Sequence, residues 1–323
     1  MFARAAIKRK SPVSNMTTNV TIVVPIYGDW PSLKECIESL INHVDLSMHQ
    51  ILLVNDCGPD VDMIEKNIQA LIHDIAHVRY ERNPKNLGFV GTCNRAVEEL
   101  DKTSNDILLL NSDTKVTPGF LDELQKVLYE SSKNGAVTPR SNNATLATIP
   151  LSAAPQKGIA PEDAFAIFLK IRHKLPRSTV VPVAHGFCML IRRDLIKKYG
   201  LFDTVFGKGY GEEVDFCQRI RKDGYRCLLA NRAFVFHLEA RSFSLETKAK
   251  LLETNNKIIW KRYPHYREQV REYMQQATKT ETAIEKSVGV DKTYSIKDYV
   301  KSMVRKNKHV HRVARRLRRS SKR

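Results

Sequence analysis

Residues 107–114 read Ile-Leu-Leu-Leu-Asn-Ser-Asp-Thr, so four apolar residues are followed at once by four polar ones. A short apolar run of this kind predicts a strand that is buried on both faces, as in a parallel sheet covered by helices. Ligands bind such sheets at the carboxyl ends of the strands. The stretch therefore predicts a class of fold, and it also puts a candidate site at Asn111, Ser112 and Asp113.

The same combination of an apolar strand and an amphipathic segment occurs four times before residue 140. The expected strands are Val20–Ile26, Ile51–Val54, His77–Tyr80 and Ile107–Leu110. Apolar residues at helical spacing follow each strand and predict helices over residues 31–44, 62–75, 89–100 and 118–129. This alternation predicts an α/β fold with a mostly parallel central sheet and helices on both faces.

After residue 140 the alternation stops, and the elements are expected in a less regular order. They are a helix over Glu162–His173, an apolar stretch over Val180–Arg192, a helix over Glu212–Asp223, strands over Arg226–Leu229 and Ala233–His237, and a helical region over 244–278. We therefore divide the chain into a basic arm (1–18), an α/β domain (19–243), a helical extension (244–295) and a basic tail (296–323).

The composition excludes several classes of protein. The chain has 323 residues, of which 42% are hydrophobic, and this is enough for a large core and too much for a wholly disordered chain. The formal net charge of +18 is concentrated in residues 1–10 and 296–323, so the body is nearly neutral. No two of the six cysteines lie two to four residues apart, which excludes zinc-ribbon and CxxC redox sites and favours buried thiols in a reducing compartment. No stretch of 18 apolar residues is present, so we expect no membrane-spanning helix.

Two polar segments at strand ends are candidate ligand sites, and each also has a simpler structural interpretation. Asp56 follows the second strand, where it either forms a turn or binds a nucleobase or ribose. Ser112, Asp113 or Thr114 would cap the helix after the fourth strand. Alternatively, the Asp113 carboxylate would bind Mg²⁺ or Mn²⁺, which often bridge a carboxylate to phosphates. The residues alone leave both choices open.

Three acids in four residues begin the expected helix at Glu212. Glu212, Glu213 and Asp215 follow a glycine-rich segment, and they either stabilise the positive end of the helix dipole or supply a general base. His237 ends an apolar run, where a single histidine is either structural or a ligand. These residues complete the set of side chains that could carry chemistry.

Several of these segments occur in the order that is typical of one enzyme family. They are Val24-Pro25-Ile26-Tyr27, Val54-Asn55-Asp56, Asn86-Leu87-Gly88-Phe89, Asn111-Ser112-Asp113, His185–Arg193 and Gly211–Phe216. Together they resemble glycosyltransferases of the GT-A fold, family 2 type. The pattern is most similar to bacterial rhamnosyl- and galactosyl-type transferases of surface polysaccharide synthesis. The His185–Arg193 segment resembles the acceptor-side segment of that family.

The resemblance implies a metal-dependent inverting glycosyltransferase. Such an enzyme would move a sugar from a UDP- or dTDP-sugar to a hydroxyl of a glycan or lipid-linked acceptor. The residues implied in binding the nucleotide-sugar donor are Pro25, Tyr27, Asp56, Asn86, Gly88 and Asn111. Asp113 would bind Mg²⁺ or Mn²⁺, and His237 would complete the protein ligands.

The catalytic base implied by the resemblance is Glu213, but the segment departs from the family pattern. Glu213 stands where the family usually has Asp, and Asn111 replaces the first acid of its DXD motif. Glu212, Glu213 and Asp215 therefore all remain candidates for the base.

The basic tail has Met303, Val310 and Leu317 seven residues apart among lysines and arginines. As a helix it would be amphipathic and would bind an anionic membrane surface, which predicts a cytoplasmic protein at the inner face of the cell membrane. The alternative is a nucleic-acid-binding protein that uses its basic termini. No aromatic residues alternate with the basic ones from Ser302 onward, and the candidate site is acidic, so no specific nucleic acid is expected.

Overall fold

A computed structural model describes residues 18–151, 160–238 and 245–290. The expected tail at 296–323, and all of the expected arm except residue 18, lie outside the described residues. Within the described ranges, no helix is both long enough and apolar enough to cross a membrane.

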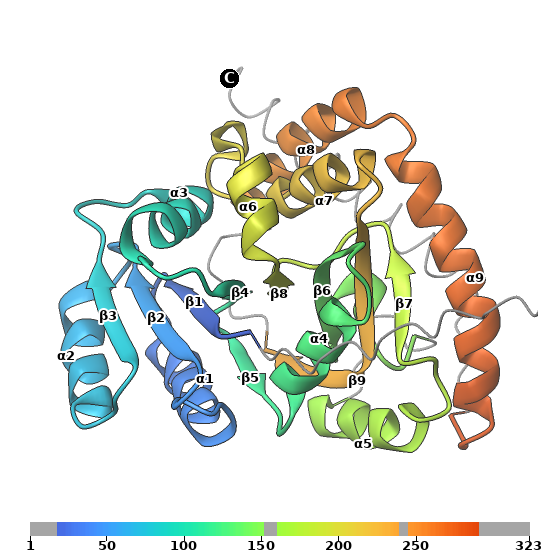
Figure 1. Cartoon of the computed structure of the whole chain (residues 1–323), viewed down its shortest axis with the longest axis horizontal. Helices are drawn as coiled ribbons and strands as arrows, with labels where there is room; N and C mark the ends of the chain where they lie inside the picture. The colour runs from blue at the N-terminus through green and yellow to red at the C-terminus, as the bar shows by residue number, and fades with distance from the viewer. Residues whose placement is uncertain (1–17, 152–159, 239–244, 291–323) are drawn as a thin grey trace, which may run out of the picture.

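The described part of the chain is built on one mixed sheet of nine strands (Figure 1). In sheet order the strands are β3 (Val78–Arg82), β2 (Gln50–Asn55), β1 (Val20–Ile26), β4 (Asp106–Leu110), β8 (Cys188–Ile191), β6 (Asn134–Arg140), β9 (Arg226–His237) and β5 (Thr114–Val116), with β7 (Ser178–Val181) also paired to β9. Strands β3, β2, β1 and β4 are parallel, whereas β8 runs antiparallel to both β4 and β6. The α/β class is confirmed, and the parallel half of the sheet is the half that the alternating pattern covers.

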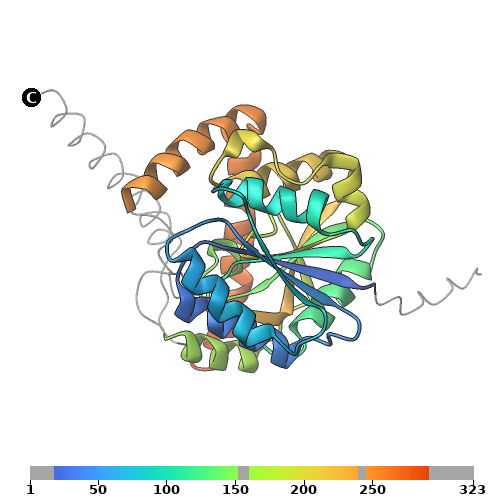
Figure 2. The same cartoon turned by 90° about the vertical axis from the view of Figure 1, so that its left-hand side faces the viewer.

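Helices cover both faces of this sheet. Figure 2 shows α1 (Trp30–His43) and α2 (Val61–Ile72) on one face and α3 (Gly88–Arg95) and α7 (Glu212–Lys222) on the other. Helix α3 continues into a π-helical turn over Ala96–Leu100. The remaining α-helices are α4 (Phe120–Tyr129), α5 (Pro161–Ile171), α6 (Arg193–Tyr199), α8 (Leu245–Arg262) and α9 (Tyr266–Lys286). Short 3-10 helices cover Thr145–Ala147 and Thr204–Phe206. Helices on two faces leave the carboxyl edge of the parallel strands open for a site.

Strand β4 lies at the centre of the core, and all five of its residues are buried. Its first residue, Asp106, is an acid in this apolar setting. The Asp106 carboxylate accepts hydrogen bonds from the Tyr129 hydroxyl at 2.5 Å and from the backbone N–H of Arg193 at 2.9 Å. These bonds compensate its burial and fix the start of the strand that leads to Asn111 and Asp113.

Two strands differ from the expectation in ways that matter for the site. Strand β5 forms between the expected fourth strand and the helix after it, where no strand is expected, and it pairs antiparallel with β9, so that Thr114 lies opposite His237. Strand β9 runs without the expected break, because its polar residue Asn231 is held on both sides. The Asn231 side chain accepts from Arg140 Nε at 2.8 Å and donates to the carbonyl oxygen of Pro176 at 2.9 Å.

Helix α9, in the expected extension, is joined to the sheet by a buried ion pair. Arg140 at the end of β6 is fully buried, and its Nη1 and Nη2 donate to the two carboxylate oxygens of Glu281 at 2.9 and 2.6 Å. Such a bidentate pair is strong when both partners are present, and the loss of one partner is costly. The last described helix is therefore part of the same folded body as the sheet.

We expect Glu281→Ala to lower the free energy of unfolding by about 3–5 kcal/mol, because it leaves the Arg140 guanidinium buried without its hydrogen-bonded carboxylate. Urea denaturation measures this change. The control is Glu272→Ala at an exposed position of the same helix, which should change the free energy of unfolding by about 0.5 kcal/mol or less. Equal values for the two variants would show that the ion pair does not stabilise the contact between α9 and the sheet.

Candidate active site

A cavity of about 530 Å³ lies at the carboxyl ends of β1, β2 and β4. Of the eleven residues to which the family resemblance gives a role, ten line it: Pro25, Tyr27, Asp56, Asn86, Gly88, Asn111, Asp113, Glu212, Glu213 and His237. The eleventh, Asp215, does not. The fold thus gathers polar side chains from widely separated parts of the chain around one space, which is the first requirement for a shared site.

The Asp56 carboxylate, just after β2, holds the start of α3. Its Oδ1 accepts hydrogen bonds from the Leu87 N–H at 2.6 Å and from Asn83 Nδ2 at 2.8 Å, and its Oδ2 accepts from the Gly88 N–H at 2.9 Å. Each carboxylate oxygen has two acceptor positions, so Oδ2 can also accept from a ligand. Asp56 is therefore held in one orientation at the cavity wall, as recognition of an N–H or O–H group requires.

Gly88 allows α3 to approach the loop that carries Lys208. Its φ is +73°, and a Cβ atom there would lie 3.1 Å from Lys208 Cα. A side chain at this position would be strained and would push the loop away. Asn255 of α8 holds the same loop, because its Nδ2 donates to the carbonyl oxygens of Phe206 at 3.1 Å and Gly209 at 2.8 Å. One wall of the cavity is therefore fixed from two sides.

Asp113 and His237 form the part of the cavity that suits a divalent cation. The pairing of β5 with β9 sets them side by side, with His237 Nε2 3.5 Å from Asp113 Oδ1. The other ring nitrogen, Nδ1, lies 2.8 Å from the carbonyl oxygen of Asn143 and must donate to it, since a carbonyl only accepts. In the neutral ring, Nε2 is then an acceptor that faces a carboxylate oxygen. A cation between the two would stabilise this arrangement.

The number of protein ligands fits Mg²⁺ or Mn²⁺ better than zinc. Among the residues that the structure describes, no group of three or more His, Cys, Asp and Glu side chains converges on one point. Structural zinc sites usually need four protein ligands, whereas Mg²⁺ commonly takes one or two carboxylates and fills its shell with water and substrate phosphates. Asp113 and His237 are therefore suited to a cation that is shared with a phosphorylated substrate.

Glu212 and Glu213 reach the cavity from the N-terminus of α7. Glu212 is buried, and its Oε2 has no hydrogen-bond partner among the described residues. Burial raises the pKa of Glu212, and repulsion from the Glu213 carboxylate raises it further. Burial also raises the pKa of Glu213, while backbone N–H groups, including that of Gly211 at 3.2 Å from Oε2, oppose the rise. Carboxyl groups with raised pKa values are suited to take up a proton near neutral pH.

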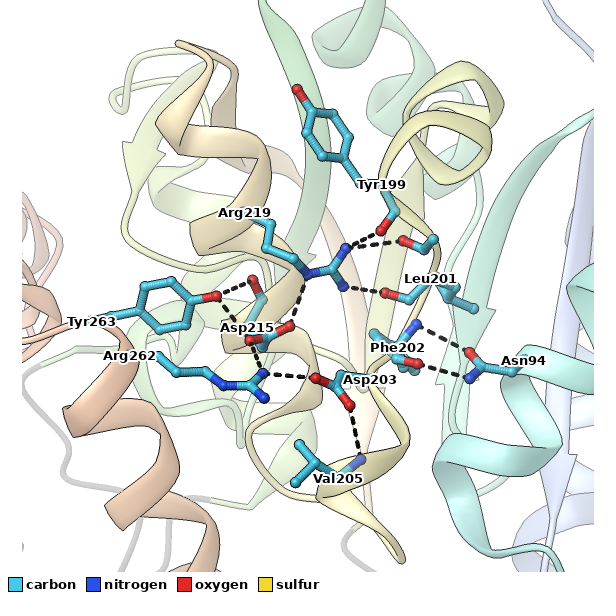
Figure 3. Close-up of polar contacts among 11 residues, drawn as sticks. Asn94, Tyr199, Leu201, Phe202, Asp203, Val205, Asp215, Arg219, Arg262 and Tyr263 are labelled. Atoms are coloured by element: carbon cyan, nitrogen blue, oxygen red, sulfur yellow. Dashed lines mark hydrogen bonds and ion pairs between the residues drawn. The ribbon is translucent and has the colours of Figure 1, made fainter.

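Asp215, the third acid of this segment, is not among the residues that line the cavity. It lies in a network of ion pairs and hydrogen bonds (Figure 3). Its Oδ2 accepts from Arg219 Nε, and its Oδ1 accepts from Arg262 Nη1 and from the Tyr263 hydroxyl, each at 2.8 Å. Because two guanidinium groups and a hydroxyl engage its oxygens, this carboxylate does not meet the requirements of a base. The expectation that Asp215 is a candidate base is corrected: it anchors α7 to α8.

The same network extends to the loop before α7, as Figure 3 shows. Arg219 also donates to the carbonyl oxygens of Tyr199 at 2.5 Å and Leu201 at 2.6 Å. Arg262, at the end of α8, donates to Asp203 Oδ2 at 2.8 Å. The helix that carries Glu212 is therefore tied both to the chain before it and to the helix from the C-terminal region.

The further residues that line the cavity include three basic ones that the sequence does not mark as site residues, namely His185, Lys208 and Lys248. Nε2 of His185 accepts from the Leu146 N–H at 3.3 Å. Burial, together with repulsion from His237, lowers the pKa of His185 to about 4. The sequence could have indicated His185 as a site residue, because it lies in the segment that resembles the acceptor side of the family. Neither lysine is marked by any pattern, since one lies in a loop and the other in a polar helix.

This combination of a mixed α/β sheet, an Asp–His pair suited to a cation and buried carboxyl groups around one cavity defines a glycosyltransferase of the GT-A fold. The chain belongs to glycosyl transferase family 2, because the model of that family matches residues 21–200. Among curated proteins, none matches the chain significantly.

Solved glycosyltransferase structures share the fold at low sequence identity. GalNAc-T7 with UDP, GalNAc and Mn²⁺ has a TM-score of 0.56 at 14% identity, and the match covers 81% of this chain. This chain spans only about half (55%) of the length of the GalNAc-T7 chain. The mannosyltransferase PcManGT from Pyrobaculum calidifontis, in complex with GDP-Man and Mn²⁺, has a TM-score of 0.56 at 15% identity over 91% of this chain and 81% of its own. S. aureus TarS 1-349 with UDP-GlcNAc has a TM-score of 0.50 at 13% identity over 84% of this chain and 76% of its own.

The dependence of stability on pH tests the raised pKa of Glu212. A carboxyl group whose pKa is higher in the folded than in the unfolded protein binds more protons when folded, so stability falls as pH rises from the unfolded pKa through the folded one. We expect Glu212→Gln to raise the melting temperature by a few degrees at about pH 8 and to leave it unchanged below about pH 4, where both states are protonated.

Differential scanning calorimetry at both pH values measures this effect. Glu98→Gln at an exposed position is the matched control, and it should show no gain that grows with pH. A Glu212→Gln protein that melts lower than the wild type at the higher pH would contradict the raised pKa.

Proposed function

We propose that this glycosyltransferase is a metal-dependent, inverting enzyme that transfers a sugar from a UDP- or dTDP-sugar to a hydroxyl of a glycan or lipid-linked acceptor. The observation that carries the proposal is that Asp113 and His237 line the same cavity as Glu213. A pair of ligands suited to a cation and a carboxyl group with a raised pKa are the two components that such a transfer needs.

On the donor side, the proposed residues bind and orient the nucleotide-sugar. Asp56 accepts from the nucleoside, beside Tyr27 and Asn86 in the same cavity wall. Asp113 and His237 hold Mg²⁺ or Mn²⁺, which when bound neutralises charge on the diphosphate. The Mn²⁺ in the GalNAc-T7 and PcManGT structures supports this metal choice, and the UDP and UDP-GlcNAc in the GalNAc-T7 and TarS structures support a nucleotide-sugar donor.

On the acceptor side, Glu213 takes the proton of the attacking hydroxyl. Of the two glutamates, Glu213 is the more exposed, and the Gly211 N–H orients its Oε2. A hydroxyl is a poor nucleophile, and a positioned base contributes roughly 10²–10⁴-fold to its reaction. A single displacement inverts the anomeric centre and needs no carboxylate nucleophile, in contrast to a retaining glycosidase.

The role in surface polysaccharide synthesis, the lipid-linked acceptor and the anionic membrane surface stay proposals from the sequence. The basic residues of 296–323 support them, because each Lys or Arg near an anionic leaflet contributes about 1 kcal/mol to binding. Among the described residues, no feature of the site supports the alternative of a nucleic-acid-binding protein. The cavity is lined by the acids Asp56, Asp113, Glu212 and Glu213, which repel a phosphate backbone unless a metal ion is bound.

We expect Glu213→Gln to reduce sugar transfer by about 10²–10⁴-fold while nucleotide binding stays intact, because the amide keeps the shape of the side chain but cannot take a proton. The assay follows nucleotide release from a panel of UDP- and dTDP-sugars with Mn²⁺, and the thermal shift with UDP or dTDP measures binding. Glu98→Gln serves again as the control. Full activity of Glu213→Gln would reject Glu213 as the base.

We expect Asp113→Ala to weaken binding of the nucleotide-sugar at least about tenfold and to abolish its response to metal, because the variant loses a charged ligand. Titration of donor binding with Mn²⁺, and then with EDTA, measures both effects. Asp122→Ala, at an exposed position of α4, should respond to metal as the wild type does. Undiminished EDTA sensitivity of the Asp113→Ala protein would exclude Asp113 as a metal ligand.

A further inference from the structure

The segment 185–187 connects the two ends of the cavity, which are the end with the proposed base Glu213 and the end with the proposed metal ligand His237. A Cβ atom on Gly186 would lie 3.6 Å from Glu213 Cβ, so the backbone here packs against the proposed base. The ring of Phe187 stacks on the ring of His237 with 5.1 Å between centroids, and the Phe187 carbonyl oxygen accepts from the Asn111 N–H at 2.8 Å. The residue just before these two, His185, also lines the cavity.

The tautomer of His185 follows from its backbone partner. Its Nε2 accepts a hydrogen bond from the Leu146 N–H at 3.3 Å, so Nε2 cannot carry a proton. Leu146 is itself held, because the Tyr273 hydroxyl of α9 donates to its carbonyl oxygen at 3.2 Å. A ring whose Nε2 is unprotonated is neutral. The proton of the neutral ring is therefore on Nδ1, which makes that atom a fixed hydrogen-bond donor.

A fixed donor between the two ends of the cavity complements the carboxylates that line it. The carboxylates of Asp56, Asp113, Glu212 and Glu213 accept hydrogen bonds from hydroxyl groups. The oxygen of a sugar hydroxyl also accepts, and a site that binds it well must present an N–H or O–H group. An inverting displacement needs the leaving diphosphate and the attacking hydroxyl on opposite sides of the anomeric carbon, so the transferred sugar lies between the two ends that segment 185–187 connects.

We propose that His185 is a specificity-determining residue whose Nδ1–H donates a hydrogen bond to one hydroxyl of the transferred sugar. This inference rests on the proposed function, because it assumes that a nucleotide-sugar occupies the cavity. His185 takes no part in proton transfer and does not bind the nucleotide. Its loss therefore changes the choice among sugars and leaves the affinity for the free nucleotide unchanged.

Two substitutions separate the two nitrogens of His185. The amide nitrogen of Asn lies close to the position of Nδ1, so His185→Asn keeps a donor there and loses the acceptor for the Leu146 N–H. The longer Gln reaches the position of Nε2, so His185→Gln keeps that acceptor and loses the donor. If the Nδ1–H selects the sugar, Asn preserves selectivity and Gln removes it. If the ring only supports Leu146, the order of the two variants is reversed.

The experiment is a double-mutant cycle between the protein and the sugar. The wild type and both variants are assayed with Mn²⁺ against the best donor of the UDP- and dTDP-sugar panel and against its monodeoxy analogues. We expect one analogue to lose about tenfold or more in kcat/KM with the wild type and with His185→Asn. With His185→Gln this analogue should react as well as the parent sugar, and all three proteins should bind free UDP or dTDP equally.

Each outcome decides a different point. A wild type that does not distinguish any monodeoxy donor overturns the inference, whether or not a variant folds. A penalty that His185→Gln keeps, or a fall in its affinity for the free nucleotide as large as the fall in kcat/KM, also overturns it and leaves the proposed function standing. A wild type that turns over none of the panel rejects the proposed function together with the inference.

Discussion

The position of the proposed base depends on a carboxylate that takes no part in the chemistry. Asp215 is fully buried three residues after Glu212, and a buried charge is tolerated only when it is compensated. Arg219 on the same helix and Arg262 at the end of α8 provide the compensation, and Arg219 also engages the carbonyl oxygen of Leu201. Helix α7, the loop before it and α8 therefore behave as one unit, and this unit presents the two glutamates to the cavity.

The metal side of the cavity is held by a different kind of interaction, the pairing of backbones. Strand β5 has only three residues, yet its pairing with the end of β9 sets the distance between Asp113 and His237. The Asn142 side chain strengthens the pairing, because it donates to the His237 carbonyl oxygen at 3.0 Å and accepts from its N–H at 2.9 Å. Strand pairing thus supports the metal side of the cavity, and ion pairs support the side that carries the two glutamates. Both are made by the chain's own residues, and such support holds the side chains of a site in fixed positions.

The parallel half of the sheet and most of the site could be predicted because carboxyl ends of parallel strands meet at one edge. Polar residues after β2 and β4 must then lie close together, whatever the rest of the chain does. Strand β5 could not be predicted, because three residues are too few to show a period of two. The continuity of β9 through Asn231 depends on Arg140, which is 91 positions away. The role of Asp215 was missed for a similar reason, since its partner Arg262 lies 47 positions later and no local pattern shows which acid a distant arginine will engage.

The pair between Arg140 and Glu281 also constrains how the polypeptide matures. The two residues are 141 positions apart, so a ribosome adding about 5–20 residues per second incorporates the arginine about 7–28 seconds before the glutamate. Until then the guanidinium must stay hydrated, and the end of β6 cannot be buried against α9. A nascent chain therefore carries every proposed catalytic side chain well before its core can close. Shortening the gene by the final turns of α9 would leave those side chains present in a protein that cannot complete its interior.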